Sequence, residues 1–327
     1  MTAAPYEPGR VRALLARRRP GFGEPIFRIV VLLAALTVLA TIIGLVVTMT
    51  VESRRGIAHN GWSFLWTSTW DQVRQVFGAL PFVYGTVMTS VTALALAMLV
   101  GVGVALFLVE LAPGWVARPV GFMVEMLAAI PSVVFGLWGI FILAPWLQQH
   151  VELPLHQRLG WLPFFSTYPT TAVGNFAAIV VLAIMVLPTV AAVSRDVIAA
   201  VPRSQREAAL ALGATRWEMM RLGVLPYARS GILGAGILGL ARGVGETMAV
   251  TMVIGNSPTI TLSLFKQGYT MASVIANEFT EATTALYRST LIEIGLLLLV
   301  ITLLINVGAR LLVWRVTGGQ PSGGALQ

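Results

Sequence analysis

Six long apolar stretches, nearly free of charged residues, constrain the fold of this chain more than any other feature of its sequence. The hydrocarbon core of a bilayer is about 30 Å thick, and a helix of about 20 residues crosses it. The first stretch alone is free of charge for 23 residues, from Ile29 to Val51. The sequence therefore predicts an all-α membrane protein with six transmembrane helices. We expect these helices at about 26–51, 82–111, 120–147, 173–194, 230–254 and 289–312.

The composition agrees with a membrane protein and excludes several other classes. Hydrophobic residues make up 57% of the 327 residues and charged residues only 11%, whereas globular proteins carry about a quarter charged residues. A soluble enzyme, a disordered chain and a collagen-like chain are therefore excluded. Because the chain has no cysteine, it cannot form disulfides, a thiolate nucleophile, an iron–sulfur cluster or a Cys-rich zinc site.

The N-terminal region carries three consecutive arginines, Arg17 to Arg19, ahead of the first apolar stretch. This order is similar to the front of a signal peptide, but a cleavable hydrophobic segment spans only about 7 to 15 residues. We therefore expect an uncleaved first transmembrane helix, followed by an extracytoplasmic loop at 52–80. Residues 1–25 are expected to form a flexible cytoplasmic arm, with an amphipathic surface helix at 11–19 as the alternative.

The distribution of Lys and Arg predicts the orientation, because cationic loops are retained in the cytoplasm. With the N-terminus inside, 15 of the 22 cationic residues fall on the inner side and 6 on the outer side, and Arg242 remains within the bilayer. Both termini, including a tail at 316–327, are therefore predicted to be cytoplasmic. The net charge of +8 reflects this topology, so we expect no nucleic acid partner.

The predicted cytoplasmic loop at 195–229 has a helical pattern of its own. Ser204–Glu207 and Thr215–Glu218 each place a hydroxyl three residues before a glutamate, as in a capping box. Gly213 lies between them and tolerates the left-handed conformation that ends a helix. The pattern predicts a helix at 205–212, a turn at Gly213 and a second helix at 216–222.

Two further features of this loop bear on its role. Pro226 is expected to stop the second helix, because proline cannot continue the backbone hydrogen bonding. Ala208, Ala209 and Ala211 make the first helix small and partly apolar, so that another surface can approach it closely. Physical reasoning alone leaves two alternatives open, namely a partner protein and the membrane surface.

The same loop contains a longer pattern. Glu207–Ala209 is followed by three residues, then Gly213, then nine residues, then Gly223–Pro226. This spacing resembles the EAA loop of ATP-binding-cassette (ABC) importer permeases, although Gly223 stands where the family pattern has isoleucine. The resemblance implies that the loop forms a coupling helix which docks onto an ATPase subunit. The residues that it assigns to ATPase coupling are Glu207, Ala208, Ala209, Gly213 and Thr215.

Three other segments resemble phosphate permeases of the PstC type. They are Ala129–Gly139, Gly239–Ala249 and Ala276–Ala282; the continuation at 250–256 favours the PstC type over its PstA-type sister. The resemblance implies the architecture of a type I ABC importer permease over residues 81–315. It also implies a subunit of a high-affinity importer that moves inorganic phosphate across the bacterial cytoplasmic membrane.

The fifth apolar stretch contains a charge that needs an explanation. An arginine at the middle of a bilayer costs at least about 3 kcal/mol, and Glu246 lies four residues after Arg242. On a continuous helix the two would share one face and pair. A purely structural ion pair is one interpretation. The other is a substrate pathway formed by Arg242, Glu246 and Thr247, because an arginine fork matches phosphate oxygens.

The chain has no G-x-x-x-x-G-K-[ST] phosphate-binding loop, so we expect a permease without enzymatic activity, catalytic residues or a cofactor of its own. The resemblance implies that ATP and Mg are bound by two PstB-type ATPase subunits. It also implies a PstA-type permease partner, a PstS-type binding protein outside the membrane, and contact with membrane lipid. The alternatives are a permease of the same class for sulfate or molybdate, and a secondary transporter or channel.

Three other signals are weaker. The string Gly234–Gly239 matches a dinucleotide-binding fingerprint, but it lies in an apolar helix, where small residues favour helix packing. His150 and His156 lack further ligands, so we expect no metal site. Glu125 and Glu293 could each pair across the bundle or point to one of its mouths, and the sequence does not choose between these roles.

Overall fold

The computed structural model of the protein describes residues 23–316, so the arm up to residue 22 and the tail from residue 317 lie outside the described residues. Between these limits the regular elements are all helical. Six helices are long and apolar enough to cross a membrane, which confirms the predicted all-α fold with six spans. They are Pro25–Glu52, Leu80–Leu111, Ser132–Leu159, Asn175–Ala199, Arg216–Val244 and Ala285–Arg315.

The chain forms two compact units, divided after Val51. The first contains helix α2 (Gly23–Glu52), which presents apolar side chains on all sides. Its hydroxyls do not interrupt this surface. Those of Thr37, Thr41 and Thr48 each donate to the carbonyl four residues earlier, over 2.7–2.8 Å, so their polar atoms are satisfied within the helix.

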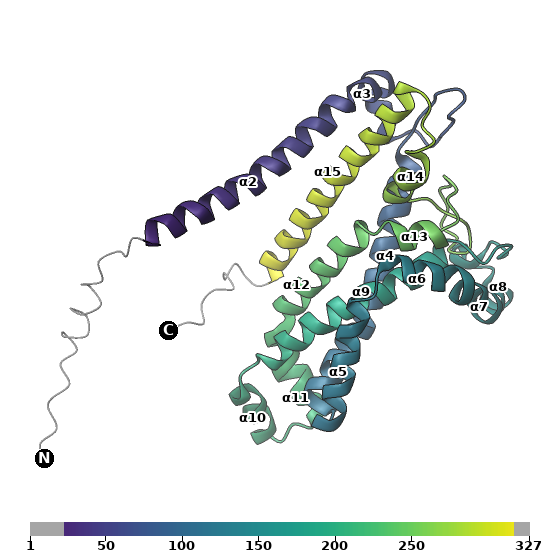
Figure 1. Ribbon diagram of the computed structural model, residues 1–327. Helices are drawn as coiled ribbons and strands as arrows, with labels where there is room; N and C mark the ends of the chain where they lie inside the picture. Colours follow the sequence, from purple (N-terminus) through teal and green to yellow (C-terminus); the bar gives the residue numbers. More distant parts are fainter. Residues whose placement is uncertain (1–22, 317–327) are drawn as a thin grey trace, which may run out of the picture. The chain divides into compact units, whose positions relative to one another are not determined.

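The second unit is built around α9 (Asn175–Ala199), which packs against α4 (Leu80–Leu106) and α12 (Leu225–Val244) (Figure 1). Residues of α4 with small side chains repeat every four positions and are buried; they are Ala93, Ala97, Gly101 and Ala105. A Cβ at Gly101 would lie 3.0 Å from a methyl carbon of Val190 on α9. Small side chains therefore let the two helix backbones approach closely.

The glycines of α12 have the same role. Gly239 and Gly243 are buried, and a Cβ at Gly239 would lie 2.9 Å from methyl groups of both Val186 and Val190. The prediction of helix packing is therefore confirmed at Gly239, whereas a Cβ at Gly234, in the same string, would meet nothing within 4 Å.

The predicted third helix at 120–147 is wrong at Pro131. Helix α5 (Gly114–Ala128) ends before this residue, and α6 (Ser132–Trp138) begins directly after it. Proline has no N–H for a continuing helix, whereas its fixed φ suits the residue before a new one. The third apolar span is therefore Ser132–Leu159. It continues from α6 through short segments, namely η3 (Gly139–Leu143), α7 (Ala144–Leu147), η4 (Gln148–Glu152) and α8 (Leu153–Leu159).

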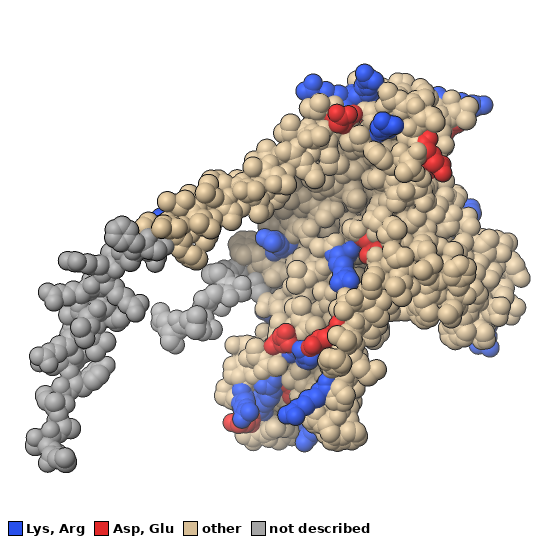
Figure 2. Space-filling model, viewed as in Figure 1, with Lys and Arg blue, Asp and Glu red and all other residues tan. Residues whose placement is uncertain are grey.

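Several short elements lie at the two ends of the second unit (Figure 1). One end carries α10 (Arg203–Ala211) and α11 (Arg216–Met219). The other carries α3 (Arg54–Asn60), η1 (Gly61–Leu65), α14 (Met271–Glu278) and the start of α15 (Ala285–Val316). Helix α13 (Met248–Val253) lies between the two ends, beside α6. On the face that Figure 2 shows, charged side chains gather mainly at these two ends and the surface between them is largely uncharged. This distribution suits a protein that spans a bilayer.

A buried glutamate organises the end opposite α10. The Glu278 carboxylate accepts hydrogen bonds from Trp70 Nε1 (2.9 Å), Gln72 Nε2 (3.1 Å), Tyr269 Oη (3.1 Å) and Tyr287 Oη. Burial raises the pKa of the Tyr269 hydroxyl, so it remains a donor well above neutral pH. One carboxylate of the segment 276–282 thus joins the loop before α4 to α14 and α15.

Candidate functional site

The loop between α9 and α12 folds largely as its pattern predicts. Helix α10 covers Arg203–Ala211 and α11 covers Arg216–Met219. Gly213 has φ of +85°, the left-handed conformation expected at the turn. Thr215 and Glu218 form a reciprocal capping box, since the Thr215 N–H donates to Glu218 Oε2 (2.8 Å) and the Glu218 N–H to Thr215 Oγ1 (3.3 Å). The turn and the second capping box are therefore confirmed.

Two details of the loop differ from the prediction. Ser204 is not a helix cap, because α10 begins at Arg203 after the extended Pro202, and no side chain caps it. Pro226 does not end the second helix either. The chain passes through a wide π-helical turn, η6 (Met220–Val224), into α12, and Pro226 lies in the first turn of that helix, where a missing N–H is tolerated.

An arginine that the sequence analysis did not assign anchors α10 to the membrane-spanning helices. Arg206 Nη2 lies 2.8 Å from Glu110 Oε1 and also donates to the carbonyl of Ile198 over 2.8 Å. Its Nη1 donates to the carbonyl of Val201. The Arg206 and Glu110 side chains are only 17% and 7% exposed. The pair therefore fixes α10 to the end of α4, which continues as a π-helical turn at Phe107–Leu111, and to the end of α9.

The loop presents one face to the bundle and another to its surroundings. The inner face belongs to an apolar cluster of Ala105, Ile198, Val201, Met219, Met220, Val224, Ala228 and Ile232. On the outer face, a hollow of about 520 Å³ opens between α10 and the chain after Gly213; its lining includes Ala208, Ala209, Leu212 and Leu222. Leu212 is 90% exposed. An exposed apolar hollow of this kind is typical of a surface that binds another protein.

Gly223 departs from the family pattern, and its surroundings explain why a small residue fits. A Cβ at this position would lie 3.3 Å from the carbonyl oxygen of Gln205 and 3.7 Å from the Cβ of Ala209. The turn η6 therefore passes close to α10 at this point. An isoleucine would require the two segments to separate.

The second predicted site lies where α12 ends. Arg242 is exposed in the last turn of α12, which stops at Val244, and α13 begins at Met248. Glu246 and Thr247 thus lie in a break between two helices. The expected pairing of Arg242 with Glu246 on one helical face is wrong, because the helix does not continue. In the part of the chain that the structure describes, no ion pair joins the two residues.

Glu246 instead caps the next helix. Its Oε1 accepts a hydrogen bond from the Ala249 N–H over 3.2 Å, and its own N–H donates to the Gly243 carbonyl over 3.3 Å. Thr247 Oγ1 donates to the Gly245 carbonyl over 3.3 Å. These bonds satisfy backbone groups at the interruption, which is the condition for non-helical backbone within a membrane.

Two of the segments that resemble phosphate permeases pack against each other. Gly136 of α6 faces α13, where a Cβ would lie 3.1 Å from the Ala249 Cα and 2.5 Å from the Met252 sulfur. One turn later, a Cβ at Gly139 would lie 2.9 Å from Val253. The glycines of Ala129–Gly139 therefore hold α13 close, and with it the break that contains Glu246.

Helix α12 connects the two sites. The loop between α9 and α12 enters it at Leu225, and Arg242 lies 17 residues further along, about 26 Å at 1.5 Å per residue. The structure does not bring the residues of the loop and of the break into contact. It places them near the two ends of one helix.

Comparisons with known proteins identify the family. A family model described as "Binding-protein-dependent transport system inner membrane component" matches residues 97–318. The phosphate transport system permease protein PstC of Haemophilus influenzae is 43% identical over 296 residues, covering 89% of this chain and 93% of that protein. The protein of the same name from Pasteurella multocida is 48% identical over 259 residues, covering 78% and 81%.

Two solved structures show the same fold. A bacterial ABC transporter for the acidic polysaccharide alginate has a chain with a TM-score of 0.59 and 14% identity, covering 94% of this chain and 99% of that chain. A chain of the MetNI methionine ABC transporter has a TM-score of 0.52 and 20% identity, covering 72% and 94%. The expected architecture of a type I ABC importer permease is therefore confirmed. By its sequence and its fold, the chain belongs to the family of binding-protein-dependent transport system inner membrane components.

Proposed function

We propose that this chain is the PstC-type permease subunit of an ATP-driven importer that moves inorganic phosphate across the bacterial cytoplasmic membrane. The observation that carries this proposal is the 43% identity to a phosphate transport permease over 89% of the chain. Since the match covers both the coupling loop and the break after α12, it supports the whole permease function and not only the fold.

The coupling loop is the docking surface for an ATPase in this proposal. Its inner face is fixed by Arg206 and by the apolar cluster under α11, while Leu212 and the hollow beside it remain exposed. Ala208, Ala209 and Gly213 line this hollow, Thr215 caps α11 beside it, and Glu207 is exposed on α10. Two PstB-type ATPase subunits would supply the bound ATP and Mg.

The other partners complete the pathway. A PstA-type permease subunit would supply the second half of the membrane pore, and a PstS-type binding protein would deliver phosphate from outside. The termini and the coupling loop would then face the cytoplasm, as the distribution of cationic residues favours.

Arg242 is the residue that we assign to phosphate contact. Its guanidinium group carries several N–H donors in a planar fork that fits two oxygens of a phosphate. Within this single subunit the side chain is exposed, so it is free to meet an anion in a pore shared with a second subunit. Glu246 and Thr247 follow it in the break, where the Glu246 carboxylate lowers the local positive potential and helps the anion to leave.

Uptake by the reconstituted transporter tests this function. The permease pair, the ATPase pair and the binding protein are assembled in vesicles and supplied with ATP and either radiolabelled phosphate, sulfate or molybdate. We expect accumulation of phosphate alone, and none when ATP is replaced by a non-hydrolysable analogue. Accumulation of sulfate or molybdate in place of phosphate would disprove the proposed substrate.

A further inference from the structure

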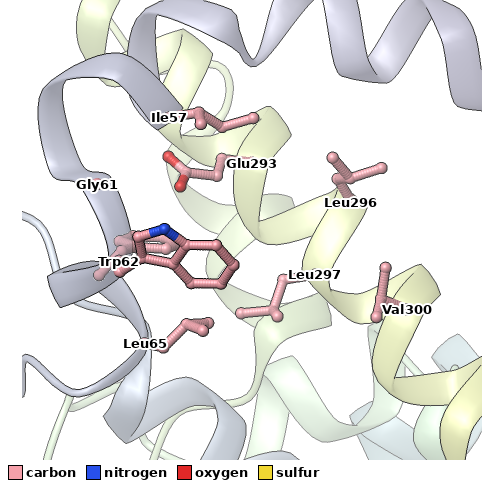
Figure 3. Close-up of a pocket in the computed structure, with 9 residues that line it drawn as sticks. Ile57, Gly61, Trp62, Leu65, Glu293, Leu296, Leu297 and Val300 are labelled. Carbon is pink, nitrogen blue, oxygen red and sulfur yellow. The ribbon is translucent and has the colours of Figure 1, made fainter.

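A cavity at the end of the second unit opposite the coupling loop has no role in the proposed transport pathway. It has a volume of about 490 Å³ and lies between the α3–η1 segment and α15 (Figure 3). This volume falls within the range of about 300 to 1,000 Å³ that is typical of ligand pockets. Its lining residues are Ile57, Gly61, Trp62, Phe64, Leu65, Glu293, Leu296, Leu297 and Val300.

Glu293 is the one charged residue of this lining, and residues of α3 lie close to its carboxylate. The residue is only 8% exposed, and its Oε2 accepts a hydrogen bond from Asn60 Nδ2 over 3.0 Å. A Cβ at Gly56 would lie 2.6 Å from the same oxygen and 3.1 Å from the Thr290 Cα, so a larger residue there would require the carboxylate to move. The amide of Asn60 serves Oε2, while the rest of the pocket wall is apolar (Figure 3).

A positively charged partner would stabilise the charged form of a carboxylate in such surroundings. Burial of an unpaired charge is unfavourable at membrane depth, and acidic residues there pair with cations. Among the ion pairs of the described residues, none involves Glu293. A ligand with a cationic group would supply such a partner.

The pocket continues into an exposed apolar stripe on α15. Val300, Leu304, Val307 and Leu311 follow Glu293 at helical spacing, and all four are exposed. Val307 lies 14 positions after Glu293, about 21 Å along the helix, which is about two thirds of the bilayer core of about 30 Å. An acyl chain in one leaflet has this chemistry and would follow most of this length.

We propose that this cavity binds a phospholipid whose headgroup carries a primary ammonium, such as phosphatidylethanolamine. The ammonium donates hydrogen bonds to Glu293, and one acyl chain lies in the pocket and along the stripe as far as Val307. Trp62, which is 86% exposed at the rim, suits the membrane–water interface, where tryptophan is enriched. The alternative occupant is a transmembrane helix of a partner subunit, but an apolar helix would leave the Glu293 carboxylate without a cation.

Photo-cross-linking in the assembled transporter tests the proposal. The full complex is reconstituted in vesicles of equal parts phosphatidylethanolamine, phosphatidylcholine and phosphatidylglycerol, with one of the three carrying a photoreactive acyl chain. Labelled peptides are then identified by mass spectrometry. We expect phosphatidylethanolamine to label the segments 57–65 and 296–300 about tenfold more than the other two lipids. The free energy of one charge-assisted hydrogen bond corresponds to a difference in affinity of about tenfold.

Two variants sharpen the test. Glu293→Gln keeps the size of the side chain but removes its charge, so the preference for phosphatidylethanolamine should disappear. Glu281→Gln changes an exposed glutamate in the segment between α14 and α15 and should leave the preference for phosphatidylethanolamine intact. The comparison of lipids in the unmodified protein needs no variant, so the test holds even if Glu293→Gln fails to assemble.

Two results would overturn the proposal. One is equal labelling of the two segments by all three lipids, or no labelling at all. The other is contact with protein at the same place. Because the chain has no cysteine, Leu296→Cys provides a single attachment point, and its efficient cross-linking to the partner permease would show that a helix fills the pocket.

Discussion

The buried pair of Arg206 and Glu110 leads to the sharpest prediction for the coupling loop. Replacing Arg206 by leucine removes the bond to Glu110 Oε1 (2.8 Å) and the bonds to two carbonyls at the end of α9. The Glu110 carboxylate, whose side chain is only 7% exposed, then has no cationic partner. Removing one partner of a buried ion pair costs about 3 to 5 kcal/mol. Because the Arg206 side chain is 17% exposed, we expect a loss of stability near the lower end of this range.

A loss of about 3 kcal/mol in the attachment of α10 raises the population of its detached state about 150-fold. The apolar cluster beneath α11 does not involve Arg206, so the permease should still insert and reach normal abundance. Amide hydrogen exchange of α10 in the assembled complex measures the attachment directly. Transport per ATP hydrolysed measures its consequence, and we expect hydrolysis to continue while phosphate uptake falls.

Arg203→Leu is the matched control, because Arg203 is exposed on the same helix. In the double variant of Arg206→Leu with Glu110→Leu, no buried charge remains, and such replacements are often close to neutral for stability. We therefore expect the double variant to recover slow exchange in α10. If Arg206→Leu exchanged no faster than Arg203→Leu, the pair would not hold α10 and the reasoning would be refuted.

Three further predictions concern the rest of the pathway. Arg242→Gln should abolish phosphate uptake at unchanged membrane abundance, and uptake near the wild-type rate would exclude a direct role for this arginine. Gly213→Val should uncouple ATP hydrolysis from uptake, because a branched residue at φ of +85° is strained by about 1 to 3 kcal/mol; normal transport would contradict the proposed turn. An impermeant thiol reagent outside intact cells should label Val73→Cys, at a side chain that is 94% exposed in the loop before α4, but not Ser204→Cys, and the reverse pattern would invert the topology.

The sequence predicts those parts of the fold that depend on local pattern. Six apolar stretches predict six spans, and a glycine between two helical segments predicts the turn at Gly213. The capping box at Thr215 is recognisable because its two partners lie three residues apart. In each case the responsible interactions are short-range or depend on hydrophobicity alone.

Contacts between distant segments could not be predicted in this way. Arg206 and Glu110 are 96 residues apart, and Glu278 collects donors that lie up to 208 residues away. No periodicity links such positions. The same limit applies to Glu293, whose carboxylate depends on Gly56 and Asn60 in another segment.

The predicted pairing of Arg242 with Glu246 is wrong for a different reason, because it assumes helical spacing across a break in the helix. Pairing four residues apart requires continuous helix, and α12 ends at Val244. The Glu246 carboxylate accepts a hydrogen bond from the Ala249 N–H. This bond needs an acceptor but no charge. A glutamine at position 246 can therefore start α13 equally well, and the charge is left free to act on the potential around Arg242. Arg242 and Glu246 thus have separable roles. Replacing both residues together should therefore not restore the phosphate uptake that Arg242→Gln abolishes.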